Sequence, residues 1–440
     1  MESDDSSKWM EAMNEELKSM AHNGVWDLIE LPNNCKPVGC KWVFKTKRDA
    51  KGNIERFKAR LVAKGFTQKE GIDYKDTFSP VSKKDSLRII MALVAHFDLE
   101  LHQMDVKTAF LNGNLDEDIY MEQPEGFAKK GNEHLVCKLK KSIYGLKQAS
   151  RQCSDLGLLR ETKEYLSKNF HMVDMGEANY VIGIEIFRDR SRGVLGLSQK
   201  GYIDRVLERF NMQSCSSGIA PILKVVGSLM YAQTCTRPDI SFAVGMLGRY
   251  QSDPGFEHWK AAKKVMRYLQ GTKDYMLTYK RSEQLEVVGY SDSDYGGCLD
   301  SLKSTSGFVF MPISWKSEKQ SITASSTMEA EFVACFEASS HALWLWNFIS
   351  GLGVVDSIAK PLRIYCDNTA AVFFSKNGKF SSGSKHMDLK YLVVKERVQK
   401  QQVSIENIRT TLMVADPLTK GLSPKAYLEH VMRMGLLSNP

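Results

Sequence analysis

The stretch Glu283-Gln-Leu-Glu-Val-Val-Gly-Tyr-Ser-Asp292 is a short apolar run that ends in a small residue and then a carboxylate. This pattern predicts a strand whose tip presents Asp292. Three later segments also place an acid at or near the end of a predicted element. They are Glu331 in helix Ser326–Ser350, Asp367 after strand Leu362–Cys366, and Asp416, which with Pro417 begins the last helix. Carboxylates gathered from separate elements are the usual ligands of a divalent metal site in proteins.

Each of these acids also has a structural interpretation. Asp294 lies two residues after Asp292, so both share one face of the strand and either could bind metal. Ser326 and Glu329 fit a capping box, which occupies Glu329 at the helix start and leaves Glu331 available. Asp367 and Asp416 could each cap a helix, and Asp416 precedes a proline as good caps often do.

Composition is typical of a soluble, globular, intracellular protein. The 440 residues are 43% hydrophobic and 25% charged, with room for two or three domains. No run of 18 apolar residues and no signal peptide is visible, so we expect no membrane segment and a cytoplasmic or nuclear location. The nine cysteines are scattered without a Cys-x-x-Cys motif, which argues against zinc and disulfides.

Positive charge is concentrated near the N-terminus. Net charge is +8, and residues 36–70 hold eleven Lys or Arg against three acids. After an amphipathic helix at Trp9–Ala21 and strands at Trp26–Leu31 and Trp42–Lys47, Arg56–Phe66 alternates basic and apolar residues. Such a strand would show Lys58, Arg60 and Val62 on one face. This face is either simply solvated or binds the phosphates of a polyanion.

A second strand runs into an acid at Glu100–Asp105, after a helix predicted at Asp85–Phe97. Asp105 by itself is as consistent with a helix cap as with a metal ligand.

Several long motifs, in order, resemble the reverse transcriptase and RNase H region of copia-type LTR retrotransposon Pol polyproteins. The reverse transcriptase motifs are Lys58-Ala-Arg-Leu-Val-Ala-Lys64-Gly-Phe, Gln103-Met-Asp105-Val-Lys-Thr-Ala-Phe110-Leu-Asn-Gly, Tyr120-Met-Glu-Gln-Pro-Glu-Gly-Phe and Tyr144-Gly-Leu-Lys-Gln-Ala. The RNase H motifs are Tyr290-Ser-Asp292, Trp315-Lys-Ser, Ser325-Ser-Thr-Met-Glu-Ala-Glu331, Asp367-Asn and Ala415-Asp416. The resemblance runs from about Trp9 to Leu437.

The resemblance implies a polymerase with fingers and palm, followed by RNase H, acting on RNA, DNA and RNA–DNA hybrids with Mg²⁺. Asp105 corresponds to the first metal-binding aspartate of the palm, and Phe110 to the aromatic residue under the incoming sugar. Lys58, Arg60 and Lys64 correspond to triphosphate or template contacts. In RNase H, the metal ligands would be Asp292, Glu331, Asp367 and Asp416, and Lys316, Lys319 and Gln320 would meet the hybrid backbone.

The polymerase half departs from the family at one essential motif. The family's Tyr-x-Asp-Asp hairpin supplies the second pair of metal ligands, and two-metal catalysis needs them. The only Asp-Asp in this chain is Asp4-Asp5, which lies before the fingers. The family pattern is interrupted between Cys153 and Ser154, where several dozen residues are missing. A shortened turn at Met311–Ile313 threatens the register of the strand that bears Trp315.

We therefore predict an α+β and α/β protein: a truncated fingers–palm region, then an RNase H-like α/β domain. The expected domains are 1–215 for reverse transcriptase, 216–283 for a connection and 284–440 for RNase H. The first functional hypothesis is an RNase H that survives beside a defective polymerase. The alternatives are a non-catalytic remnant that at most binds nucleic acid, or a working polymerase whose missing exon was lost in the gene model.

Overall fold

The computed structural model divides into two compact units, each described here by itself. Unit 1 comprises residues 1–83 and 102–176, and unit 2 comprises residues 84–101 and 177–440. The described residues are 5–33, 35–48, 53–69, 71, 83–106, 114–128, 131–147, 172–212, 222–282, 286–298, 300–353, 361–376 and 385–438. No helix within these ranges is long and apolar enough to cross a lipid bilayer.

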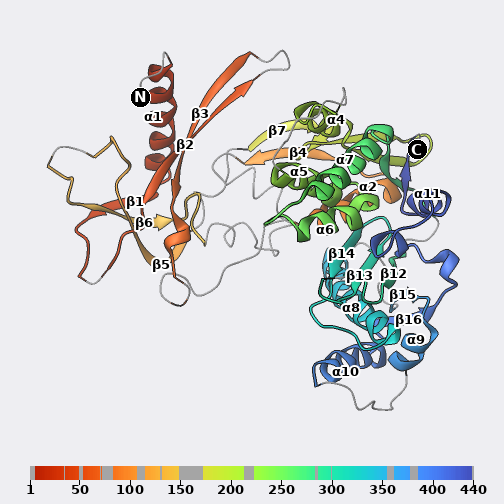
Figure 1. Cartoon of the computed structure of the whole chain (residues 1–440). Helices are drawn as coiled ribbons and strands as arrows, with labels where there is room; N and C mark the ends of the chain where they lie inside the picture. Colours follow the sequence, from red (N-terminus) through yellow and green to blue (C-terminus); the bar gives the residue numbers. More distant parts are fainter. Residues whose placement is uncertain are drawn as a thin grey trace. The chain divides into compact units, whose positions relative to one another are not determined.

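The described part of unit 1 consists of small sheets and the helix α1, as Figure 1 shows. Its elements are α1 (Ser6–His22), β1 (Trp26–Ile29), β2 (Cys40–Arg48), β3 (Ile54–Ala63), η1 (Gly65–Thr67), β4 (His102–Val106), β5 (Asn114–Met121), β6 (Val136–Lys141) and β7 (Met172–Glu177). The sheets have the orders β1-β6-β5, β2-β3 and β4-β7.

The β2–β3 hairpin has the two faces that its sequence predicts. Ala59, Leu61 and Ala63 of β3 are buried, whereas Lys58 and Arg60 point to the other face. The buried face packs on α1, whose Trp9 ring meets the rings of β2 and β3 aromatic residues. The amphipathic helix predicted at residues 9–21 is therefore confirmed, and its apolar stripe serves packing.

The first half of unit 2 is an antiparallel sheet with a group of helices. The sheet order is β17-β11-β10-β9-β8. The elements are α2 (Lys84–Phe97), β8 (Tyr180–Val181), β9 (Ile184–Asp189), β10 (Val194–Ser198), α4 (Lys200–Arg209), α5 (Ile222–Cys235), η5 (Pro238–Ile240), α6 (Ser241–Arg249), α7 (Phe256–Gly271), β11 (Met276–Lys280) and β17 (Leu436–Leu437). Strands β9 and β10 pair as an antiparallel hairpin.

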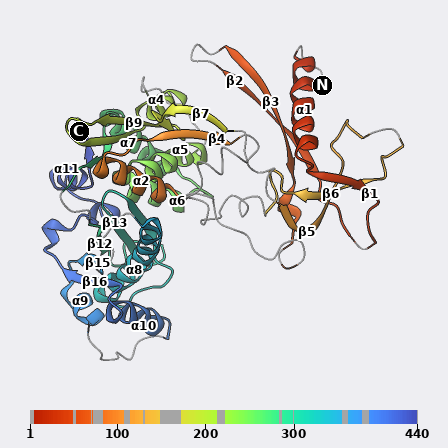
Figure 2. The same ribbon diagram turned by 180° about the vertical axis from the view of Figure 1, so that it is seen from behind.

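The second half of unit 2 is a mixed sheet, with order β14-β13-β12-β15-β16. Its elements are β12 (Val288–Ser293), β13 (Thr305–Phe310), β14 (Ser314–Lys319), α8 (Thr327–Leu352), β15 (Leu362–Cys366), α9 (Thr369–Lys376), α10 (Lys385–Gln399), β16 (Val403–Asn407), η7 (Thr410–Leu412), η8 (Asp416–Leu418) and α11 (Pro424–Arg433). The first three strands are antiparallel, and β15 and β16 add in parallel. Helix α8 lies against β12 and β13 in both views of Figures 1 and 2. Together with the sheets of unit 1, this mixed architecture confirms the predicted α+β and α/β class.

The short turn at residues 311–313 does not disturb the sheet. Strands β13 and β14 pair without a break from Thr305↔Lys319 to Phe310↔Ser314, and Val309 faces Trp315. The shift of register that the short turn could have caused is absent from this hairpin.

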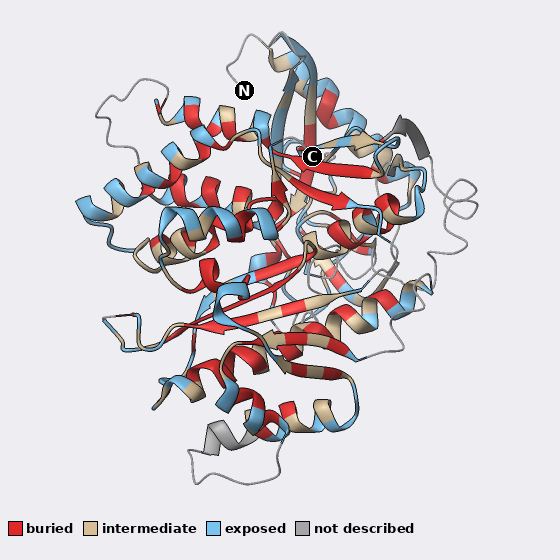
Figure 3. Cartoon of the chain, turned by 90° about the vertical axis from the view of Figure 1, so that its right-hand side faces the viewer, coloured by how far each residue is buried: buried red, intermediate tan, exposed pale blue. Residues whose placement is uncertain are grey.

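Helix α2 is shared by the cores of both halves of unit 2. Its Met91 and Val94 pack with β10 and β11 residues, and its Ile89 and Leu93 pack with Phe308 and other residues of the mixed sheet and α8. In Figure 3, helices of the chain carry buried residues along one side and exposed residues along the other. Helix α2 belongs to the predicted reverse transcriptase region, yet its side chains complete a core whose other residues come from much later in the sequence. The predicted domain boundaries remain a prediction.

The last helix does not begin at Asp416, so that prediction is wrong. Asp416–Leu418 forms a single 3-10 turn, and α11 begins at Pro424 after Ser423. Leu418 is fully buried and the Thr419 hydroxyl donates to Asp292, which fixes this turn against the sheet. The signature of a cap residue followed by proline recurs at Ser423-Pro424, and this later copy is the one that begins α11.

Candidate metal centre

Two of the predicted acids meet because their strands run in parallel. Strand β12 pairs with β15 in parallel through Tyr290↔Tyr365, so the carboxyl ends of both strands lie at one edge of the sheet. Asp292 lies near the end of β12, and Asp367 directly follows β15. An oxygen of each lies within 4.8 Å of the other and of an oxygen of Asp416. The Asn407 side chain donates to the Asp367 carbonyl at 3.2 Å, which orients that turn from the neighbouring strand.

Helix α8 contributes Glu331 to the same place. The Ser293 N–H donates to Glu331 Oε1 at 3.2 Å, and the Cys366 thiol lies 3.9 Å from Oε2. Oxygens of Glu331 and Asp367 and the Cys366 sulfur form a group within 4.8 Å. Glu331 therefore joins the edge where Asp292 and Asp367 end their strands.

The competing carboxylates have structural partners. Asp294 accepts a hydrogen bond from the Thr305 N–H on the adjacent strand. Glu329 Oε2 accepts from the Ser325 N–H at 2.8 Å, and the Ser326 hydroxyl accepts from the Glu329 N–H at 3.2 Å. Ser326 is the N-cap of α8, as predicted, although Glu329 reaches back one residue further than a capping box requires.

The caps proposed for Asp367 and Asp416 are taken by other groups or are absent. The side chain of Asn368, not Asp367, accepts from the Ala371 N–H at 3.0 Å at the start of α9. The turn at Asp416–Leu418 has no side-chain cap. Both carboxylates are thus available to the cluster.

Two residues that the sequence did not single out complete the cluster. Lys420 Nζ lies 2.9 Å from Asp416 Oδ1 and 3.4 Å from Asp292 Oδ1. The Thr419 hydroxyl donates to Asp292 Oδ2. The available signal in the sequence was that Lys420 follows Asp416 by four positions. This spacing does not predict the contact with Asp292, which depends on the turn.

Burial makes negative charge costly at this centre. It raises the pKa of Asp292 to about 7, against the opposing effect of Lys420. Burial, followed by repulsion from Asp292, also raises the pKa of Glu331, and burial raises that of Asp416. Interactions with Asp292 and Asp416 raise the pKa of Lys420 although burial opposes them. Crowded buried carboxylates of this kind are stabilised by a nearby cation.

The donor set fits Mg²⁺. Hard divalent cations prefer carboxylate oxygens, and here three such oxygens lie within 4.8 Å of one another with Glu331 beside them. The neighbouring Cys366 thiol contacts Cys335, and this contact together with burial raises its pKa, which disfavours the thiolate. Cys366 is therefore not a ligand suited to a hard cation.

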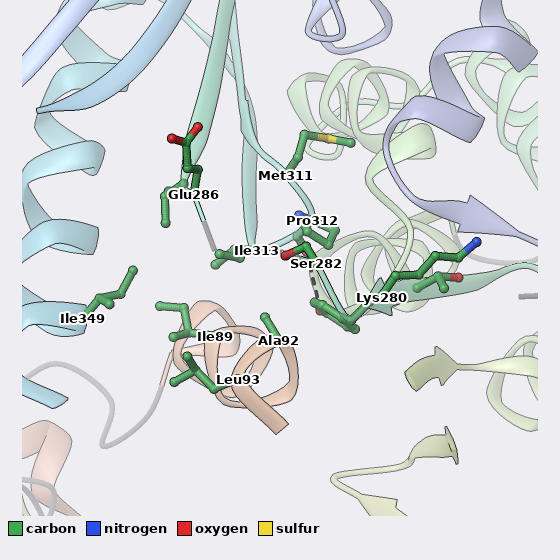
Figure 4. A pocket seen from close by; sticks show the side chains of 13 residues that line it. Ile89, Ala92, Leu93, Lys280, Ser282, Glu286, Met311, Pro312, Ile313 and Ile349 are labelled. Carbon is green, nitrogen blue, oxygen red and sulfur yellow. Dashed lines mark hydrogen bonds between the residues drawn. The ribbon is translucent and has the colours of Figure 1, made fainter. Parts of the chain in front are cut away.

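A cavity of about 180 Å³ lies elsewhere in unit 2. It is bordered by α2, β11, the turn between β13 and β14, and α8, with Ile89, Leu93, Ile313 and Ile349 among its lining (Figure 4). None of the four acids lines it, so it is separate from the metal centre.

Comparisons with known proteins agree on one family. A family model described as reverse transcriptase (RNA-dependent DNA polymerase) matches residues 23–155 and 151–224. The retrovirus-related Pol polyprotein from transposon TNT 1-94 of Nicotiana tabacum is 40% identical over 492 residues, covering 94% of this chain and 37% of the relative. That from transposon RE1 of Arabidopsis thaliana is 34% identical over 503 residues, covering 98% of this chain and 34% of the relative. The chain belongs to the copia-type retrotransposon Pol family.

This copia-type chain spans about a third of the length of these curated relatives. Among solved structures, it is similar to the foamy viral protease-reverse transcriptase in complex with dsDNA, with 12% identity and a TM-score of 0.45 over 92% of this chain and 84% of that chain. That likeness is too distant to carry an argument.

The predicted internal deletion of the copia-type sequence is confirmed. Both alignments with the plant relatives are longer than the 440-residue chain itself, so the relatives carry residues that have no counterpart here. The reverse transcriptase model matches as two segments that meet at residues 151–155. This is the point between Cys153 and Ser154 where the family pattern breaks.

The predicted polymerase residues are only partly within the described structure. Asp105 lies in β4, which pairs with β7, but its side chain is outside the described part. Phe110 and residues 148–171 also lie outside it. The sequence contains no second Asp-Asp that could join Asp105, as Asp4-Asp5 precedes α1.

The predicted backbone-binding cations are mostly exposed. Lys58 of β3 lies opposite Lys45 of β2, and Arg60 lies over the Tyr144 ring at 4.9 Å. Lys64 directly follows β3 and is half-buried. On β14, Lys316 forms an ion pair with Glu318, and Lys319 is exposed.

Gln320 does not face a ligand, so that expectation is wrong. It is buried, and its amide donates to the Ala330 carbonyl and the Ser306 hydroxyl.

Proposed function

We propose that the metal centre of unit 2 cleaves the RNA strand of RNA–DNA hybrids with Mg²⁺. One observation carries this proposal: carboxylate oxygens of Asp292, Asp367 and Asp416 come within 4.8 Å of one another from separate elements, and Glu331 reaches the same edge from α8. The reaction class comes from the resemblance of the motifs around Asp292, Glu331, Asp367 and Asp416 to RNase H.

The roles of the acids follow from their surroundings. Asp292 and Asp367 end adjacent parallel strands and would hold Mg²⁺ between them. Glu331, fixed by the Ser293 N–H, and Asp416, fixed by its tight turn, would complete the ligand set. When bound, the metal would activate water and stabilise charge on the phosphate and the leaving oxygen.

The substrate class follows from charge and from the sugar. A hybrid duplex presents phosphates, which Lys58, Arg60, Lys64, Lys316 and Lys319 suit by charge. The 2′-hydroxyl distinguishes the RNA strand from the DNA strand at the cleavage site. The partners are therefore RNA, DNA and their hybrids.

DNA synthesis is absent under this proposal. Asp105 lacks the pair of aspartates that a two-metal polymerase requires, and the break at residues 151–155 falls just before the place where the family carries them.

The second candidate function is a non-catalytic remnant that at most binds nucleic acid. The internal deletion favours it, because once polymerase activity is lost with part of the palm, the RNase H activity is no longer needed for copying the element.

Cleavage of a labelled hybrid by the full chain at millimolar Mg²⁺ tests the proposal. We expect Asp367→Asn and Glu331→Gln to abolish cleavage and leave the fold intact. Glu329→Gln is the matched control, because it removes the same charge from the same helix. It should keep activity and cost about 1 kcal/mol of stability at most. A folded wild-type chain that leaves the hybrid intact would establish the remnant hypothesis instead.

A further inference from the structure

Lys420 occupies the space between two of the acids. Its Nζ lies 2.9 Å from Asp416 Oδ1 and 3.4 Å from Asp292 Oδ1. Among the described residues, no other ion pair to Asp292, Glu331, Asp367 or Asp416 is present. The two aspartates are almost completely buried, whereas the Lys420 side chain is 36% exposed. The cation is thus the part of this group that is in contact with solvent.

This ammonium and a divalent ion compete for the same oxygens. Mg²⁺ binds oxygen at about 2.0–2.1 Å and requires close octahedral geometry. An ion held by Asp292 Oδ1 and Asp416 Oδ1 would take the two oxygens that Lys420 Nζ now contacts, and the two positive charges would repel each other. The two cations therefore cannot share these oxygens.

We propose that Lys420 is a built-in counter-cation of the metal-free protein, which must withdraw before a divalent ion binds through Asp292 and Asp416. The proposal rests on the proposed function in taking these acids as the metal ligands. The flexible, partly exposed side chain of Lys420 can turn outward without disturbing the sheet. By competing for these oxygens, Lys420 lowers the metal affinity of the centre.

The effect of this competition on the metal affinity can be estimated. If the ammonium occupies the oxygens for nine-tenths of the time, the apparent affinity for the metal falls about tenfold. Removing the charge should therefore tighten metal binding by about this factor. It should also destabilise the metal-free protein, because the buried carboxylates then repel each other without compensation.

The test compares Lys420→Met with wild type as full chains and without nucleic acid. Calorimetric titration with MgCl2 should give a Kd about tenfold lower for the variant. Thermal unfolding in EDTA should give a lower Tm, and millimolar Mg²⁺ should restore it. Lys425→Met, which removes an equal charge from an exposed site on α11, should leave both quantities unchanged. Lys420→Arg, which keeps the charge, should restore the Tm in EDTA.

Two outcomes overturn the inference. One is an unchanged or weaker affinity for Mg²⁺ in both Lys420→Met and Lys420→Gln. The other concerns variants that are unfolded in EDTA. The inference requires that Mg²⁺ restores their fold, so variants that stay unfolded in millimolar Mg²⁺ refute it. Hybrid cleavage is measured separately. Tighter Mg²⁺ binding without any cleavage would refute the proposed function alone, and cleavage without a change in Mg²⁺ binding would refute the role of Lys420 alone.

Discussion

Replacing Asp292 by Asn should abolish activity and stabilise the metal-free protein. The side chain is 1% exposed, and asparagine has nearly the same shape. Its carbonyl oxygen can still accept the hydrogen bond from Thr419, and Lys420 keeps its contact with Asp416. The substitution therefore removes a charge from the crowded cluster and changes little else.

The size of the gain follows from the pKa. Burial raises the pKa of Asp292 to about 7, roughly three units above its ordinary value of about 4. Each unit corresponds to about 1.4 kcal/mol, so ionising Asp292 costs the folded state at most about 4 kcal/mol above pH 7. Lys420 loses one of its two partners in the variant, which offsets part of the gain. We expect a net stabilisation of about 2–3 kcal/mol at pH 8 without divalent ions.

The pH dependence has a definite sign. The pKa of Asp292 is higher in the folded state than in the unfolded state, so folding binds a proton between about pH 4 and pH 7. The stability of wild type should therefore fall as pH rises through this window. The variant lacks this contribution, and its advantage should appear at pH 8 and vanish near pH 4.

Thermal unfolding in EDTA at pH 4 and pH 8 measures the effect. For a unit of this size, the gain at pH 8 corresponds to a rise in Tm of roughly 5–10 °C. Adding Mg²⁺ should raise the Tm of wild type much more than that of the variant. Asp294→Asn, two residues further along the strand, is the matched control for activity and should still cleave the hybrid. A lower Tm for Asp292→Asn at pH 8 in EDTA would refute the reasoning from buried charge.

Three further predictions concern other parts of the chain. Primer extension on an RNA template should not exceed that of a mock preparation, and extension above it would mean that other acids replace the missing aspartates. Nucleic-acid binding should weaken with salt, and replacing Lys58, Arg60 and Lys64 by alanine should reduce the log–log salt slope by roughly 2 to 3, while an unchanged affinity would count against the basic hairpin. Arg88→Met should lower the free energy of unfolding of unit 2, measured in urea, by about 3–5 kcal/mol, because buried Arg88 pairs with an acid of its own helix and donates to three carbonyl groups. The ion pairs of Arg190 are exposed, so the control Arg190→Met should cost about 1 kcal/mol at most. Equal costs for the two variants would refute the prediction.

Local signals in the sequence were sufficient for many elements. The strand at Leu362–Cys366 has the bounds that its apolar run predicts, and α8 begins after Ser326 as its cap predicts. The alternation of Arg56–Phe66 predicts the two faces of β3. These features depend on neighbours within a few residues, so the sequence contains the necessary information. The break at Cys153–Ser154 was equally readable, because it is a property of the order of motifs.

Tertiary structure decided what depends on contacts across the chain. Asp292 and Asp294 share a strand face, and only the pairing of Asp294 with Thr305 on the neighbouring strand separates their surroundings. Lys420 had no visible partner until a tight turn brought it to Asp292, 128 residues earlier. Helix α2 likewise looked like part of the reverse transcriptase, yet its apolar residues fill the core beside the mixed sheet. Periodicity tells which residues are buried, but the partner of a buried charge or an apolar face is chosen by packing over long sequence separations.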